Sequence, residues 1–133
     1  MQNSILAAYE AKKYKDIKEL PKFRPGDTVR VNYEIQEGSS DKKKVRIQAF
    51  EGVVIRLKKG RVDGSFTVRK MGANNVGVER VFPMSTPNIK KVDVLARGVV
   101  RRSRLLYLRE RSGKSARIKS RQIVRQKKTA AKA

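Results

Sequence analysis

The clearest regular pattern in the sequence lies between residues 28 and 35. Apolar side chains fill every second position there, namely Val29, Val31, Tyr33 and Ile35. Strict alternation predicts a β-strand with one buried face and one solvated face. The preceding "RPGD" supplies a turn, because Pro25 fixes one central φ and Gly26 accepts the positive φ that a type II turn requires next. A strand is therefore expected to begin immediately after this turn.

Further short strands follow the first, and turn signals separate each from the next. We expect one long, curved strand over residues 45–57, with Gly52 at a bend or bulge. Shorter strands are expected in "SFTVRKM" (65–71), "VGVERVF" (76–82) and "IKKVDVL" (89–95). Turn signals at such close spacing favour a small antiparallel barrel or sandwich over parallel strands joined by helices. The predicted fold class is mainly β, with a short N-terminal helix over residues 3–15.

The positive charge of the chain is large and unevenly placed. Lys and Arg number 34 against 12 Asp and Glu, a formal net charge of +22 on 133 residues. Residues 1–96 hold 20 basic and 11 acidic side chains, whereas residues 97–133 hold 14 basic and 1 acidic. A large polyanion is the expected partner, because neutralised phosphates release condensed counterions and so convert surplus Lys and Arg into affinity. We therefore divide the chain into an N-terminal helix (1–20), a β-barrel domain (21–96) and a basic C-terminal extension (97–133).

The composition argues against several classes of function. The sequence has neither Cys nor His, so it offers no thiolate or imidazole metal ligand and no imidazole base. It also lacks a carboxylate pair at a catalytic spacing, so we expect neither an enzyme nor a cofactor. No stretch approaches the roughly 20 apolar residues of a membrane span, and the first residues do not resemble a signal peptide. We expect a soluble, intracellular protein that does not bind membranes.

The stretch "RRSRLLYLRERSGKSARIKSR", residues 101–121, carries nine Lys or Arg side chains around a short apolar cluster. A solvated helix fits it poorly, because Arg97 would stand beside Arg101 and Arg101 beside Arg104. A membrane-surface helix also fits poorly, because Arg101 would share the sector of the leucines. Wrapping on a phosphate backbone needs neither a clean polar face nor a continuous helix. We therefore expect the extension to bind phosphates and to be largely disordered without them.

The kind of nucleic acid is constrained by what the extension lacks. Tyr107 is its only aromatic side chain, so stacking on bases cannot be its main device. No zinc finger, leucine zipper or convincing helix-turn-helix is present, which leaves recognition of folded RNA by shape and phosphate position. The lysine run at 42–44 is either a solubilising hairpin tip or a further phosphate contact. The alternative function is a free-standing nucleic-acid chaperone or DNA-compacting protein, and a membrane-active cationic protein is a more distant one.

Five segments of the sequence resemble those of one protein family. They are "FRPGDTVRV" (23–31), "QAFEGVVI" (48–55), "SFTVRKM" (65–71), "VGVERVFPMSTPNI" (76–89) and "RGVVRRSRLLYLRERSGKSARIKS" (97–120). In order and spacing they are similar to the L-nineteen family of bacterial large-subunit ribosomal proteins. The resemblance implies a small SH3-like antiparallel barrel with a basic C-terminal extension, acting as a structural constituent of the large ribosomal subunit in the cytoplasm.

The resemblance also implies partners and contacts. The family binds large-subunit ribosomal RNA near the interface with the small subunit and contributes to intersubunit bridges with small-subunit ribosomal RNA. Neighbouring proteins would belong to the L-three and L-fourteen families. The RNA contacts implied by position are Arg69, Lys70, Arg80, Arg97, Arg101, Arg102, Arg104, Arg109, Lys114, Arg117 and Lys119.

Overall fold

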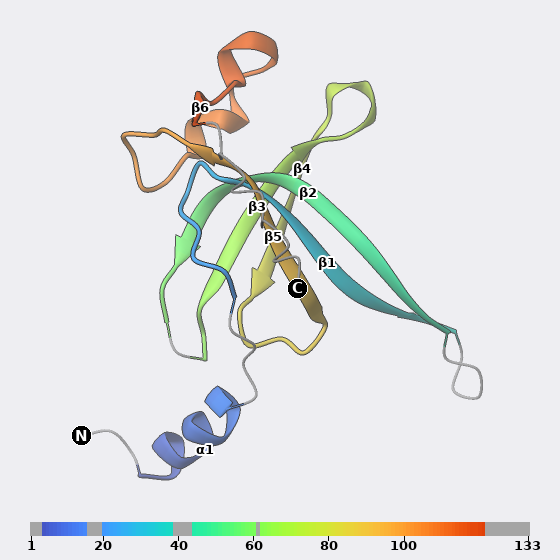
Figure 1. Cartoon of the computed structure of the whole chain (residues 1–133), viewed down its shortest axis with the longest axis vertical. Helices are drawn as coiled ribbons and strands as arrows, with labels where there is room; N and C mark the ends of the chain where they lie inside the picture. The colour runs from blue at the N-terminus through green and yellow to red at the C-terminus, as the bar shows by residue number, and fades with distance from the viewer. Residues whose placement is uncertain (1–3, 16–19, 39–43, 61, 122–133) are drawn as a thin grey trace, which may run out of the picture.

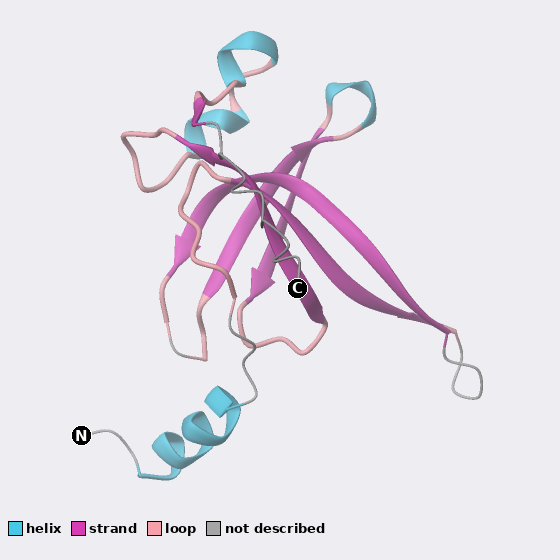
Figure 2. Cartoon of the chain, in the orientation of Figure 1, coloured by secondary structure: helices cyan, strands magenta, loops and turns pink. Residues whose placement is uncertain are grey.

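Over the residues that the structure describes, the chain is mainly β, with one α-helix near its start (Figure 2). The computed structural model describes residues 4–15, 20–38, 44–60 and 62–121. Its elements are α1 (Ser4–Lys15), β1 (Thr28–Glu37), β2 (Lys44–Lys58), β3 (Ser65–Met71), η1 (Ala73–Asn75), β4 (Gly77–Pro83), β5 (Ile89–Gly98), η2 (Leu106–Arg109), η3 (Gly113–Ala116) and β6 (Ser120–Arg121), where η denotes a 3-10 helix. The predicted helix and the predicted strands are confirmed. The two residues of β6 and the 3-10 helices were not expected from the sequence.

The strands form one antiparallel sheet in the order β4-β3-β2-β1-β5-β6. The sheet curls strongly on itself (Figure 1), and β4 and β6 are its two edges. It is therefore a curled half-barrel, not a barrel closed by backbone hydrogen bonds. Side chains bridge part of the opening, since the ring of Phe82 on β4 lies 5.8 Å from the ring of Tyr33 on β1.

The main core lies on the concave face of the curled sheet. Its buried members are Phe23, Val29, Val31, Tyr33, Phe50, Val54, Phe66, Val68, Phe82, Ile89 and Val92. The alternation that predicted β1 is confirmed, because Val29, Val31 and Tyr33 all point into this core. Phe66 is at its centre, with ring centroids 5.0 Å from Phe23 and 5.4 Å from Phe82. Five aromatic rings and a set of β-branched side chains thus fill the interior.

The backbone geometry requires glycine at two positions, 26 and 52. Gly26 has a φ of +97°, which agrees with the turn predicted before β1. Gly52 pairs with Val29 without any irregularity, and the register shift of β2 against β3 falls between Val54 and Arg56 instead. A Cβ on Gly52 would lie 2.4 Å from the Arg69 carbonyl oxygen, so Gly52 permits a close backbone approach. The bulge expected at Gly52 is therefore located at the intervening residue, Ile55.

A second apolar cluster lies on the opposite face of β2. Ile55 is fully buried there, and the cover comes from Leu105 and Leu108 of the extension. The Leu105 N–H donates to the Ile55 carbonyl oxygen over 2.9 Å. Because a bulge leaves a residue outside the regular ladder, the Ile55 carbonyl is available to a segment from elsewhere in the chain. The extension is thus attached to the sheet by both packing and a backbone hydrogen bond.

Over residues 98–121, this attachment differs from the expectation that the extension is disordered without RNA; residues 122–133 lie outside the described residues. Residues 98–121 follow a defined path that includes η2, η3 and β6, and β6 pairs with the end of β5. Gly113 has a φ of +63°, which is incompatible with a continuous α-helix through this position. Residues 98–121 have few apolar side chains of their own, but the sheet provides the other half of the cluster. Leu105 and Leu108 are buried there, and further side chains of the segment pack beside them.

We predict that Leu105→Ala lowers the free energy of unfolding by about 2–5 kcal/mol, as is typical when a large core side chain is truncated. The reason is that Leu105 is fully buried and joins the extension to β2. The measurement is urea unfolding of the whole chain. Leu106→Ala is the matched control, because Leu106 is 42% exposed and should change stability little. If both variants lost the same stability, the packing of Leu105 against Ile55 would not contribute to the stability of the fold.

Candidate nucleic-acid interface

The extension turns its charge outward. Its Lys and Arg side chains between residues 97 and 121 are all exposed, namely Arg97, Arg101, Arg102, Arg104, Arg109, Arg111, Lys114, Arg117, Lys119 and Arg121. Glu110 is the only acidic residue in this span and is also exposed. Leu105 and Leu108 are buried against the sheet, so the apolar side of the segment is used for attachment. The predicted contact residues of the extension therefore lie on the surface of a folded segment.

A hollow of about 500 Å³ opens on the surface of the extension. Its basic lining consists of Arg101, Arg102, Arg111, Arg117 and Lys119. Tyr107 also lines it, and the guanidinium carbons of Arg102 and Arg111 lie 5.5 and 4.9 Å from the centre of its ring. Cations within about 6 Å of an aromatic ring are attracted to it. Tyr107 therefore helps to hold two like-charged side chains close together.

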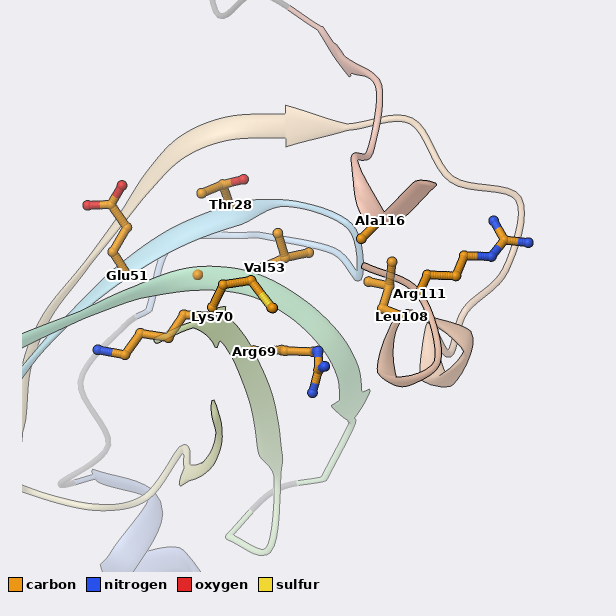
Figure 3. A pocket seen from close by; sticks show the side chains of 10 residues that line it. Thr28, Glu51, Val53, Arg69, Lys70, Leu108, Arg111 and Ala116 are labelled. Carbon is orange, nitrogen blue, oxygen red and sulfur yellow. The ribbon is translucent and has the colours of Figure 1, made fainter. Parts of the chain in front are cut away.

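Arg111 is absent from the contacts implied by the family resemblance, although the structure places it at the edge of two hollows. The second hollow, of about 310 Å³, lies between the outer face of the sheet and the extension (Figure 3). Arg69 and Lys70 of β3 line it together with Arg111. In Figure 3, Lys70 and Arg111 point away from each other. Arg111 belongs to the basic stretch 101–121, but the charge pattern does not show which arginine of that stretch lines a hollow.

The predicted contacts on the sheet are divided between two locations. Lys70 places its ammonium nitrogen 4.6 Å from the centre of the Phe50 ring. Arg80 lies 3.9 Å from the centre of the Tyr33 ring and donates to the Tyr33 hydroxyl. Arg69, in contrast, is turned toward the extension. The structure therefore brings Arg69 near the basic extension and uses Lys70 and Arg80 to cover aromatic rings of the core.

One carboxylate connects the sheet to the extension. Glu79 of β4 lies opposite Arg69 of β3 in the ladder and accepts from it over 2.9 Å. The same carboxylate accepts from Arg109, through Nε at 2.9 Å and through Nη2 at 2.8 Å. Glu79 and Arg69 are largely covered, with 21% and 15% of their side chains exposed. Two of the predicted contact residues are thus held in place by a shared acidic partner.

These hydrogen bonds change the ionisation of the carboxyl group. The bonds from Arg109 make the largest contribution, and together with Arg69 they hold the pKa of Glu79 below its ordinary value despite partial burial. The pKa of Arg109 is raised by the same contact. Glu79 is therefore charged over the whole neutral range of pH, and its ion pair with Arg109 holds that side chain in place.

The remaining surface offers no sign of other chemistry within residues 4–15, 20–38, 44–60 and 62–121. No three acidic side chains in these ranges come close enough together to bind a metal ion. No helix in the same part of the chain is long and apolar enough to cross a bilayer. Of the lysine run 42–44, only Lys44 lies within the described residues, and it is exposed.

The fold and this surface define a small, basic, mainly β protein in which residues 98–121 are folded against a curled sheet. Comparison with known proteins makes the class specific, because the model of the family described as Ribosomal protein L19 matches residues 4–121. The chain belongs to the ribosomal protein L19 family. This confirms the resemblance read from its sequence segments.

Individual relatives are similar over most of the chain. Large ribosomal subunit protein bL19 of Petrotoga mobilis is 50% identical over 119 residues, which cover 90% of this chain and 98% of the relative. The bL19 proteins of Aliarcobacter butzleri and Campylobacter lari are 48% and 50% identical, each over 90% of this chain and 97% of the relative. The family is one of ribosomal proteins and not of enzymes.

We predict that Glu79→Gln reduces the pH dependence of folding stability in the acidic range. A carboxyl whose folded pKa is below its unfolded pKa stabilises the fold above the ordinary value, and this contribution disappears as the pH falls through the lowered value. Urea unfolding between about pH 5 and pH 3 should therefore show a smaller loss in the variant than in the wild type. Glu110→Gln is the control, because Glu110 is exposed and has no ion-pair partner among the described residues. If stability depended on pH in the same way in the wild type and both variants, the ion pairs of Glu79 with Arg69 and Arg109 would not stabilise the fold.

Proposed function

We propose that this chain is a structural constituent of the large subunit of the bacterial, cytoplasmic ribosome. Membership of the ribosomal protein L19 family supports this assignment, and the relatives are named as large ribosomal subunit proteins. The chain acts by binding ribosomal RNA near the interface with the small subunit, where it contributes to intersubunit bridges. It has no catalytic role in this proposal.

The observation that carries RNA binding is the exposure of every cation on the folded part of the extension. Ten Lys and Arg side chains between residues 97 and 121 face outward, with Glu110 as the one acid among them. Attachment through Leu105 and Leu108 fixes the backbone that carries these charges. A preorganised array of cations loses less conformational freedom on binding than a disordered one, so more of its electrostatic attraction to phosphate appears as affinity.

The proposed division of labour follows the three predicted segments. Residues 21–96 form an SH3-like platform and residues 97–133 bind RNA, although β5 crosses that boundary because it runs to Gly98. The proposed RNA contacts remain Arg69, Lys70, Arg80, Arg97, Arg101, Arg102, Arg104, Arg109, Lys114, Arg117 and Lys119. The proposed partners are large-subunit RNA, small-subunit RNA, and neighbouring proteins of the L-three and L-fourteen families.

The alternative function is a free-standing nucleic-acid chaperone or DNA-compacting protein. It shares the charge but does not require a rigid sheet to which the extension is attached. Sedimentation of a cell lysate in high salt distinguishes the two, because an integral ribosomal protein stays with the large subunit. A protein that washes off completely would favour the alternative.

We predict a steep dependence of RNA affinity on salt. Each phosphate contact contributes roughly 0.7 to 0.9 to the slope of log affinity against log salt, so six or more contacts imply a loss on the order of a thousandfold between about 50 and 200 mM. Arg101→Gln with Arg102→Gln should flatten the slope by roughly one to two units and leave preference among RNAs unchanged. The measurement is binding to large-subunit ribosomal RNA fragments across a salt series.

Tyr107→Leu is the companion variant in this series. An aromatic ring releases no counterions, so the slope should stay close to that of the wild type. A flat slope in the wild type, or a steep loss of RNA discrimination in the double Arg variant, would mean that the extension reads bases and not phosphates.

A further inference from the structure

A third hollow, of about 610 Å³, lies where the segment before β1 meets the ends of β5 and β6. Four cations line it, two from each part of the chain: Lys22, Arg24, Arg97 and Arg121. All four side chains are exposed. Three of them are absent from the contacts implied by the family resemblance. Lys22 and Arg24 lie outside the basic extension, where the charge pattern of the sequence gave no reason to look.

A buried carboxylate holds the two sides of this hollow together. Asp27 is 5% exposed, and its Oδ2 accepts from the Arg24 N–H over 2.9 Å while its Oδ1 accepts from the Gly98 N–H over 3.0 Å. The bond between Asp27 and Gly98 joins residues 71 positions apart in the sequence. The two chain segments also touch, because a Cβ on Gly98 would lie 2.0 Å from the Gly26 carbonyl oxygen. The segments that carry Arg24 and Arg97 are therefore fixed relative to each other; in Figure 1 they lie side by side.

The lining of the hollow keeps a net positive charge. Among the described residues that line it, Asp27 is the only acid beside the four cations, and each of its two oxygens is already bonded to a backbone N–H. Within the described residues, none of the four cationic side chains forms an ion pair. By contrast, Lys90 and Lys91 elsewhere on β5 each pair with a carboxylate. Backbone N–H groups are thus the hydrogen-bond donors to Asp27, and the four cations of the hollow are available to a ligand.

The chemistry of the lining selects phosphate over a base. Of the described residues that line the hollow, only Phe23 is aromatic, and its ring is buried against Phe66 in the main core. No ring is therefore free to stack on a nucleobase. Exposed guanidinium and ammonium groups around a fixed backbone suit the oxygens of a phosphodiester instead.

We propose that this hollow binds phosphate groups of the RNA backbone, so that the RNA interface combines the segment before β1 with the extension. The inference rests on the proposed function and adds a site to it. The hollow shares Val99 and Val100 with the hollow beside Tyr107. A single strand of RNA backbone can therefore pass from one basic surface to the other without crossing an acidic one.

The test compares two variants that each lose two positive charges. Lys22→Gln with Arg24→Gln removes cations from the hollow and keeps the Arg24 backbone N–H that Asp27 needs. Arg56→Gln with Lys59→Gln is the matched control, because both side chains are exposed, line none of these three hollows and are not among the proposed RNA contacts. Binding to large-subunit ribosomal RNA fragments is measured across a salt series for both variants and the wild type.

We expect the hollow variant to lose affinity on the order of tenfold or more near 100 mM salt and to flatten the salt slope by roughly one to two units. The control should change affinity less than about threefold. In a second measurement, titration of the labelled wild type with inorganic pyrophosphate at low salt should shift the amide signals of Arg24, Gly98 and Val99 saturably. The hollow variant should lose these shifts while its unfolding midpoint stays unchanged.

Three outcomes would overturn the inference. Equal losses of affinity in the two variants would mean that net charge alone matters, and wild-type affinity in the hollow variant would mean that RNA does not reach this site. Failure of the wild type to bind ribosomal RNA at all would overturn the proposed function as well. If Arg101→Gln with Arg102→Gln weakens binding but the hollow variant does not, only the present inference fails.

Discussion

The contact between Ile55 and Leu105 holds residues 98–121 against the sheet. A strand that is apolar on one face needs only one core, but β2 has buried side chains on both, with Val54 facing the main core and Ile55 facing the extension. The bulge at Ile55 leaves its carbonyl oxygen free to accept the Leu105 N–H. Without this cover, Ile55 would be exposed to water and residues 98–121 would have little apolar surface to hold them against their own charge.

Two acidic side chains link separate segments of this chain, which has only 12 Asp and Glu residues. Glu79 joins Arg69 to Arg109, and Asp27 joins the Arg24 backbone to Gly98. Each carboxylate connects the central sheet to a segment that carries exposed cations. The acids therefore determine where positive charge is held, without neutralising most of it. This arrangement explains how a chain with a net charge of +22 can be folded over its described residues and still present cations to a polyanion.

The features predicted correctly from the sequence depend on neighbours along the chain. The alternation of Val29, Val31 and Tyr33 predicted β1, and "RPGD" predicted the turn at Gly26, because strand periodicity and turn dihedrals are local properties. The bulge was misplaced, since a glycine can serve either a bulge or a close approach and only the facing strand decides which. The surplus of cations after residue 96 is visible in the sequence, but nothing in the sequence indicates that Arg111, Lys22 and Arg24 line hollows.

By itself, the sequence determined a mainly antiparallel β protein, its family, and a surplus of positive charge concentrated after residue 96. Composition, periodicity and motif order carry that information, and none of them requires knowledge of distant contacts. Only the tertiary structure decided that the consecutive apolar residues Val53 to Ile55 serve two faces, that Leu105 covers one of them, and that Asp27 brings Arg24 beside Arg97. These contacts join residues tens of positions apart, and their partners are selected by the curl of the sheet, which no local pattern in the sequence describes.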